Sequence, residues 1–287
     1  MLPPNYEFLA GIPENVGIKK MPARCAKACG SPSRSIIHIL FLALPRALEG
    51  QQSGSFPPGW NGLARTPPMG WRSWNPIGPT TNQADVEAHI DLIAASDAYG
   101  FANGISLASL GYSDVGIDEG WEGCGEGVNG TQHDASGKPV IHTEAFNDTA
   151  AMVARAHAKH LTMGWYMNGC ACGEPVEKAI NYAGDVQAAF DFGFDGVKFD
   201  GCGSQNNMTL YAEYFNRTGK AFVVEDCKAG DCTGDDNSAC ATLEWCPFNL
   251  FRVSRDVDNS NTRWFLNLQV SDFIFSPGKL LLLYTTL

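Results

Sequence analysis

The sequence predicts an α/β fold of the (β/α)8 TIM-barrel type, incomplete, with about six strand units present. From residue 62 onward, short apolar stretches with strand character alternate with helical stretches, which is typical of a parallel sheet. Acidic residues repeatedly follow the strand-like stretches, at the end where barrel proteins carry their functional groups. In addition, 44% of the 287 residues are hydrophobic, which is enough to form a large buried core.

The expected elements follow one another in regular order. Strands are expected at residues 69–74, 114–118, 161–167, 196–200, 221–225 and 248–256. Helices are expected at residues 148–160, 185–192 and 210–215, and residues 82–110 should be mostly helical, with interruptions at Gly100 and Gly104. Residues 129–140 carry Asn-Gly and Ser-Gly turn signals and should form a hairpin or loop insertion. A closed barrel has eight strands, so about two units are missing from this pattern.

The charge and the motifs exclude several classes of function. The net charge of -11 argues against a nucleic-acid partner, which would need a basic surface. The sequence contains no Gly-rich phosphate loop and no metal-binding pair of histidines. His157 and His160 are better explained as part of a solvated helix face. We therefore expect no cofactor and no metal, and the oligomeric state, a homodimer included, stays open.

The cysteines and glycosylation sequons favour the secretory pathway. Ten cysteines are present, eight of them between Cys124 and Cys246, which is many for a cytosolic protein. Four Asn-x-Thr sequons add to this signal, at Asn129, Asn147, Asn207 and Asn216. The alternative is a set of chance sequons and reduced thiols. We expect a secreted protein or one of a lysosome-like or vacuole-like compartment.

The N-terminal segment, residues 1–61, is expected to be poorly ordered. Its apolar run at residues 36–44 is much too short for a membrane-spanning helix, so no membrane span is expected. Basic residues precede this run and small residues follow it, which is the layout of a signal peptide at about residues 21–50. This layout suggests Met21 as the true start.

Two pairs of side chains point to chemistry with paired carboxylates. Side chains alternate along a strand, so Lys198 and Asp200 should both point into the barrel mouth, as should Arg252 and Asp256. An ammonium beside a carboxylate favours the ionised acid, which can then act as a nucleophile. Glycosidases need one ionised and one protonated carboxyl group across the scissile bond. A helix-capping role for each acid is the alternative.

Five ordered stretches resemble glycoside hydrolase family 27, the α-galactosidases and α-N-acetylgalactosaminidases. Residues 62–74 read GLARTPPMGWRSW, residues 110–121 read LGYSDVGIDEGW, and residues 197–202 read VKFDGC. Residues 162–166 match the third strand of the family, and residues 252–256 hold an arginine and an aspartate at the spacing of the family. The resemblance covers about three-quarters of the chain, and VKFDGC is its most specific motif.

The resemblance implies a role for each matching residue. Asp200 would be the catalytic nucleophile and Asp256 the acid/base. Cys202 would form a disulfide with Cys170 or Cys172. Six residues would bind the sugar: Trp74, Asp118, Glu119, Tyr166, Lys198 and Arg252.

Departures from the family pattern leave the substrate and the extent of the domain open. Glu119 stands where the family usually has a second aspartate. Residues 225–228 (EDCK) replace the family sequence that reads the C2 substituent, so galactose and N-acetylgalactosamine both stay open. The barrel domain is expected at residues 62–270, and residues 271–287 form a divergent tail. The last two strand units and the usual C-terminal β domain are absent, which suggests a truncated chain.

The expected function is therefore hydrolysis of terminal α-D-galactosyl residues by a retaining exo-glycosidase, with an α-galactoside carbohydrate as substrate. Two alternatives remain, an α-N-acetylgalactosaminidase and a catalytically inactive fragment.

Overall fold

The computed structural model describes residues 61–96, 98–100, 104–167, 172–174, 178–201, 204–227 and 248–251. Within them lies one parallel sheet of six strands in sequence order, β1-β2-β3-β4-β5-β6. The strands are β1 (Met69–Arg72), β2 (Tyr112–Gly116), β3 (Thr162–Met167), β4 (Gly196–Phe199), β5 (Val223–Asp226) and β6 (Leu250–Phe251). An all-parallel sheet in sequence order is the arrangement of a partial (β/α) barrel.

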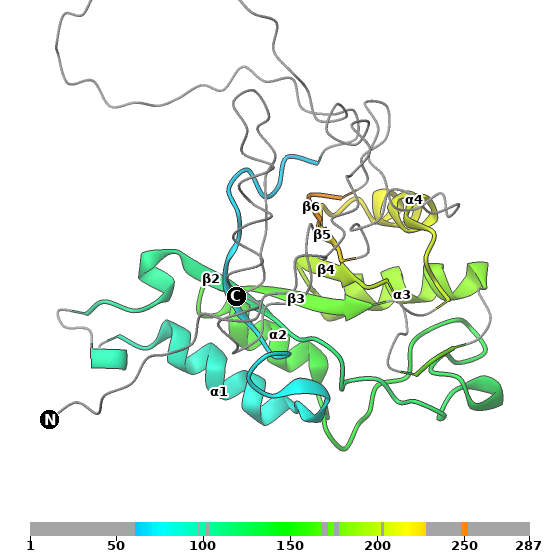
Figure 1. The fold of residues 1–287 in the computed structure, drawn as a ribbon, viewed down its shortest axis with the longest axis horizontal. Coiled ribbons are helices and arrows are strands. Elements are labelled where there is room, and N and C mark those ends of the chain that lie inside the picture. The colour runs from blue at the N-terminus through cyan, green and yellow to red at the C-terminus, as the bar shows by residue number, and fades with distance from the viewer. Residues whose placement is uncertain are drawn as a thin grey trace, which may run out of the picture.

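Four α-helices connect and cover the strands (Figure 1). They are α1 (Gln83–Ala94), α2 (Thr149–His157), α3 (Ala179–Phe192) and α4 (Met208–Thr218). Three of them begin at a side chain that accepts a hydrogen bond from a backbone N–H of the first turn, which satisfies a donor left over at the helix start. These capping residues are Asn82, Asp148 and Asn207.

The main core lies between the sheet and these helices. Its largest members are aromatic, and Trp165 of β3 stacks on Phe194 with ring centroids 4.9 Å apart. Phe199 of β4 packs against Tyr211 of α4 at 4.3 Å. Such aromatic pairs add to the stabilisation that burial of their area provides. The core thus fixes β3 and β4, the two central strands, against α3 and α4.

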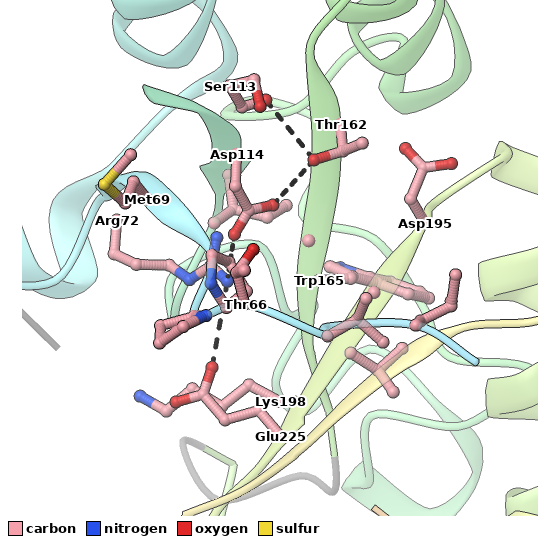
Figure 2. Close-up of a pocket in the computed structure, with 18 of the residues that line it drawn as sticks. Thr66, Met69, Arg72, Ser113, Asp114, Thr162, Trp165, Asp195, Lys198 and Glu225 are labelled. Carbon is pink, nitrogen blue, oxygen red and sulfur yellow. Dashed lines mark hydrogen bonds and ion pairs between the residues drawn. The ribbon is translucent and has the colours of Figure 1, made fainter. Parts of the chain in front are cut away.

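The opposite face of the sheet, the barrel lumen, carries charged side chains (Figure 2). Arg72 of β1 extends over Gly116 of β2, where an added Cβ would lie 2.1 Å from its Nη1. Its guanidinium forms an ion pair with Asp114 at 2.9 Å and lies 3.9 Å from Glu225. Arg72, Asp114 and Glu225 are among the residues that line a cavity of about 500 Å³. A side chain at position 116 would therefore displace the Arg72 side chain from its path across the lumen.

The structure confirms the order of the predicted strands and corrects several helices. The stretch predicted to be mostly helical at residues 82–110 forms an α-helix only as far as Ala94, and the two glycines predicted to interrupt it, Gly100 and Gly104, adopt positive φ angles of 78° and 75°. In the described part of residues 95–110, short 3-10 turns lie at Ala98–Gly100 and Ala108–Leu110. The predicted helices at 185–192 and 210–215 begin earlier, at Ala179 and Met208.

The predicted loop insertion at residues 129–140 is confirmed. It contains the 3-10 turn Val128–Gly130 and an antiparallel bridge between His133 and Pro139. Of the strand predicted at 248–256, residues 248–251 fall within the described residues, and Leu250–Phe251 of them form β6. No helix in the part of the chain that the structure describes is long and apolar enough to cross a bilayer.

Candidate functional site

Five of the predicted site residues meet at the carboxyl ends of three adjacent strands. Asp118 and Glu119 follow β2, Tyr166 lies near the end of β3, and Lys198 and Asp200 lie at the end of β4. The Lys198 Nζ donates to Asp118 Oδ2 over 2.6 Å. The Tyr166 hydroxyl lies 2.8 Å from Glu119 Oε1 and 3.2 Å from Asp200 Oδ2. The mouth of the half-barrel therefore gathers three carboxyl groups around one ammonium and one phenol.

Strand register explains why these side chains converge. Tyr166 of β3 pairs with Lys198 of β4, which pairs with Glu225 of β5. Paired residues of neighbouring strands point to the same face, so all three face the lumen. Asp200 follows Lys198 by two positions and continues that face at the mouth. The expected alternation of Lys198 and Asp200 is thus consistent with their contacts to Asp118 and Tyr166.

The groups at the mouth raise the pKa values of both Lys198 and Glu119. Burial would lower the pKa of Lys198, but Asp118, with Cys227 and Glu225, raises it above its ordinary value, so the side chain stays an ammonium. The pKa of Glu119 is raised by burial and by the charges of Asp118 and Asp200, against a lowering hydrogen bond from Tyr166. Glu119 is therefore more ready to hold a proton than an ordinary glutamate.

Two supporting contacts fix the loop after β2. The Ser73 Oγ accepts a hydrogen bond from the backbone N–H of Asp118 at 2.8 Å. The Trp121 Nε1 donates to the backbone carbonyl of Tyr166 at 3.1 Å. Sequence reasoning missed Ser73 because a serine beside a strand carries no distinctive signal. Both contacts hold the acid-bearing loop to its neighbouring strands.

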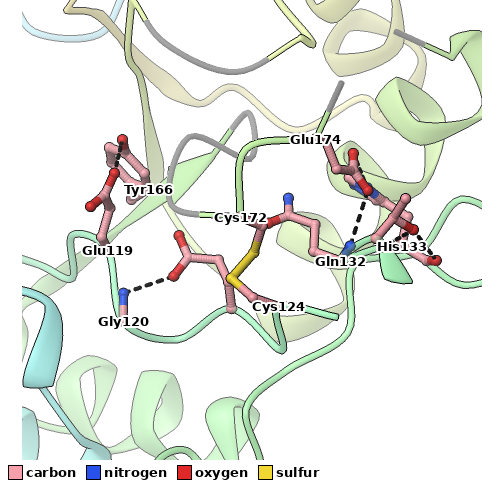
Figure 3. The surroundings of a disulfide bond; sticks show 10 residues. Glu119, Gly120, Cys124, Gln132, His133, Tyr166, Cys172 and Glu174 are labelled. Carbon is pink, nitrogen blue, oxygen red and sulfur yellow. Dashed lines mark hydrogen bonds and ion pairs between the residues drawn. A yellow bond between two sulfur atoms is a disulfide. The ribbon is translucent and has the colours of Figure 1, made fainter. Parts of the chain in front are cut away.

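Glu122 is a buried carboxyl group beside this loop. Its Oε2 accepts the backbone N–H of Gly120 over 2.7 Å (Figure 3), and its Oε1 is buried without a hydrogen-bond partner. Burial raises its pKa to about 7, with smaller raising contributions from Glu119 and Asp118. Sequence reasoning did not single out Glu122, since a glutamate in a loop usually lies in solvent.

We expect Glu122→Gln to flatten the pH dependence of stability between pH 4.5 and 7. The folded chain holds the Glu122 proton more tightly than the unfolded chain. The contribution of this protonated group to the free energy of unfolding is therefore complete below pH 4.5 and is lost as pH rises through 7. The loss amounts to about 1.4 kcal/mol per pH unit across that window. Urea unfolding at pH 4.5 and 7 measures this effect. Relative to the wild type, the free energy of unfolding of the variant should be higher at pH 7 than at pH 4.5. The exposed Glu144→Gln serves as control, and an equal gain there would contradict the prediction.

The disulfide near the site differs from the expected pairing. Cys172 is bonded to Cys124, with Cα atoms 5.0 Å apart, so the predicted alternative of Cys202 with Cys172 is wrong (Figure 3). The reason is that the loop between β2 and α2, which includes the insertion at residues 129–140, brings Cys124 to the loop that holds Cys172. The motif around Cys202 does not reveal this contact. The other alternative, Cys202 with Cys170, lies outside the described residues. The observed bond links the insertion to the loop after β3.

A buried ionic cluster reinforces the same junction. The His133 Nδ1 lies 2.8 Å from Glu174, and its Nε2 lies 2.9 Å from Asp185 of α3. The Tyr211 hydroxyl donates to the second oxygen of Asp185, and Gln205 donates to Glu174. Burial would lower the pKa of His133, but the two carboxylates raise it to about 9, while the pKa of Glu174 is lowered to about 2 against burial by His133 and Gln205. The imidazolium therefore stays charged over most of the accessible pH range.

Other predicted site residues are less well defined. Trp74 lies two positions beyond β1 and is 37% exposed. Asp256, Arg252 and the loop around residues 228–247 lie outside the described residues. In the described part of the chain, no group of three or more His, Cys, Asp or Glu side chains is arranged to hold a metal ion.

The parallel half-barrel and its acidic mouth place the chain among the (β/α)-barrel proteins with a polar site at the strand ends. A family model described as alpha galactosidase A matches residues 66–267. The chain belongs to glycoside hydrolase family 27, the family of α-galactosidases and α-N-acetylgalactosaminidases.

The chain is similar to curated proteins named as α-galactosidases and α-N-acetylgalactosaminidases. A probable α-galactosidase B from Penicillium simplicissimum is 28% identical over 214 residues, covering 72% of this chain and 45% of the relative. An α-N-acetylgalactosaminidase from Gallus gallus is 27% identical over 231 residues, covering 77% and 55%. The chain thus spans about half the length of the curated relatives it matches.

Solved structures show the same fold. α-Galactosidase I from Mortierella vinacea matches with a TM-score of 0.53 at 24% identity, covering 68% of this chain and 47% of that one. A family 27 β-L-arabinopyranosidase from Geobacillus stearothermophilus, in complex with arabinose, matches with a TM-score of 0.55 at 16% identity, covering 74% and 58%. The half-barrel therefore corresponds to part of the family's barrel.

Proposed function

We propose that the protein is a retaining exo-glycosidase that hydrolyses terminal α-D-galactosyl residues. One observation carries this proposal. At adjacent strand ends, Lys198 is hydrogen-bonded to Asp118, and Tyr166 is within hydrogen-bonding distance of Glu119 and Asp200. Membership of family 27 supports the same chemistry.

In this mechanism, Asp200 attacks the anomeric carbon and forms a covalent glycosyl-enzyme, which water then hydrolyses. Lys198 donates a hydrogen bond to Asp118 and holds its side chain in place, so that the remaining lone pairs of Asp118 accept hydrogen bonds from sugar hydroxyls. Trp74, which is 37% exposed, provides a ring face against the apolar C–H surface of the sugar, and the buried Tyr166 contributes its hydroxyl to Glu119 and Asp200. Release of the leaving group requires a protonated acid opposite Asp200, and we assign this role to Asp256.

The register of β6 supports the assignment of Asp256. Leu250 pairs with Glu225, so its side chain is on the lumen side of the sheet. The strand expected from the sequence at residues 248–256 would place Arg252 and Asp256 on the side of Leu250. That side also holds Asp200, as a pair of catalytic carboxyl groups requires.

Hydrolysis of p-nitrophenyl α-galactoside by the full chain tests the proposal. The α-N-acetylgalactosaminide and the β-L-arabinopyranoside are assayed in parallel, because two of the similar proteins carry these names. We expect the α-galactoside to react fastest. A faster reaction of another glycoside would reassign the substrate. If the folded protein hydrolyses none of the three glycosides, the proposal is wrong and this chain is inactive.

We also propose that the protein follows the secretory pathway. The Cys124–Cys172 disulfide is favoured by an oxidising compartment. The asparagines of the four sequons are all exposed: Asn129, Asn147, Asn207 and Asn216. By contrast, Asn181, which is not part of a sequon, is buried. We expect the protein secreted from eukaryotic cells to lose mass on enzymatic removal of N-linked glycans. An unchanged mass would argue against this route.

A further inference from the structure

The Tyr166 hydroxyl lies between two carboxyl groups but has a single hydrogen. It lies 2.8 Å from Glu119 Oε1 and 3.2 Å from Asp200 Oδ2. A phenol donates one hydrogen bond and can accept others. When both carboxyl groups are ionised, only one of them can receive the Tyr166 hydrogen. The shorter distance indicates that Glu119 competes well for it.

The surroundings of Glu119 favour its uptake of a proton. Asp118 and Glu122 face it from its own loop, Tyr166 from β3, and Lys198 and Asp200 from β4. The ammonium of Lys198 donates to Asp118, and its charge is the smallest of the contributions to the pKa of Glu119. Burial, with the charges of Asp118 and Asp200, raises the pKa of Glu119, while the hydrogen bond from Tyr166 and the charge of Lys198 lower it.

We propose that Glu119 is a positioning residue that acts through Tyr166 and determines whether the Tyr166 hydroxyl hydrogen is donated to Asp200. The proposal rests on the proposed role of Asp200 as nucleophile. A protonated Glu119 donates to the Tyr166 oxygen, and Tyr166 then donates to Asp200. An ionised Glu119 accepts the Tyr166 hydrogen, and Asp200 loses that donor.

The proton balance of this switch is simple. Glu119 releases its proton to solvent, the phenol O–H bond rotates from Asp200 toward Glu119, and no bond to carbon forms or breaks. Tyr166 itself stays protonated, because burial and the charges of Asp200 and Glu119 raise its pKa well above the ordinary value. At acidic pH the arrangement thus directs the Tyr166 hydrogen to the nucleophile.

The test follows the hydrogen bonding of Tyr166 directly in the full chain. Tyrosine labelled with 13C at ring carbon ζ is incorporated, and the Tyr166 signal is identified by its loss in Tyr166→Phe. We expect this signal to shift in one step as pH rises through the titration of Glu119. The step should vanish in Glu119→Gln, which is always neutral, and persist in the exposed control Glu144→Gln.

Two results would overturn the coupling: a Tyr166 signal that does not change with pH, or a step that survives in Glu119→Gln. Activity measured on the same samples separates this outcome from failure of the proposed function. A step without hydrolysis supports the coupling and contradicts the function, whereas hydrolysis without a step overturns the coupling alone. In an active chain, the same step should appear in the pH profile of kcat for the wild type and be lost in Glu119→Gln.

Discussion

Replacement of Asp200 with Asn is expected to lower the rate of α-galactoside hydrolysis by on the order of 10⁴-fold. Asn has nearly the same shape but lacks the charge needed to attack the anomeric carbon. It can still accept the hydrogen bond from Tyr166, which approaches Asp200 Oδ2 at 3.2 Å. The loss should therefore appear in kcat, with the fold and the free energy of unfolding nearly unchanged.

The matched control is Asp191→Asn on the exposed surface of α3. Its side chain is 45% exposed and lies 4.0 Å from Lys138, a pair that contributes little. We expect its kcat and KM to equal those of the wild type. An Asp200→Asn variant that retains more than about one-tenth of the wild-type rate would contradict a nucleophilic role, since removal of a nucleophile costs far more.

Replacement of His133 with Gln is expected to lower the free energy of unfolding by about 3–5 kcal/mol. The imidazolium lies between Glu174 and Asp185, and all three side chains are buried. Removing the cation leaves two carboxylates in a site of low polarity. Because the cluster ties the insertion after β2 to α3, we expect residues 122–141 to open first. Urea unfolding and amide hydrogen exchange measure these two effects.

The contribution of this cluster also depends on pH. The pKa of His133 is raised to about 9, so its contribution is complete below the ordinary value of 6.5 and is lost as pH rises through 9. The pKa of Glu174 is lowered to about 2, so its contribution is complete above 4.5 and is lost as pH falls through 2. The contributions of His133 and Glu174 are thus both complete between pH 4.5 and 6.5, whereas burial raises the pKa of Asp185, whose contribution is complete only below its ordinary value of 3.8.

His157→Gln provides the comparison. His157 also contacts a carboxylate, Asp195 at 2.7 Å, but its side chain is 41% exposed. Exposed ion pairs are worth about 1 kcal/mol or less. Equal destabilisation by His157→Gln and His133→Gln, measured at pH 5.5, would show that burial of the His133 cluster has no special effect.

Much of the fold and of the polar mouth could be predicted from the sequence. Strand periodicity located β1–β5 to within a few residues, and the alternation within VKFD is consistent with the contacts of Lys198 and Asp200. The motif around Asp118 and the strand with Tyr166 led to the same site, because parallel strands end together at one edge. These signals are local, so they can be read from a single sequence.

The parts that could not be predicted depend on contacts between distant segments. The Cys124–Cys172 bond and the His133 cluster join residues 41 to 52 positions apart. Neither a lone histidine in a loop nor ten cysteines with many pairings reveal such partners. The passage of Arg72 across Gly116 likewise depends on the curvature of the sheet, which no local pattern encodes.

The central claim is that Asp200 forms a covalent bond with the sugar. The most direct measurement is to incubate the folded chain with a fluorinated α-galactosyl fluoride, which slows breakdown of a glycosyl-enzyme, and to locate the added mass by peptide sequencing. The account predicts one sugar per chain, attached to Asp200 and absent in Asp200→Asn. Attachment to another carboxylate, or no attachment to chain shown to be folded, would contradict it.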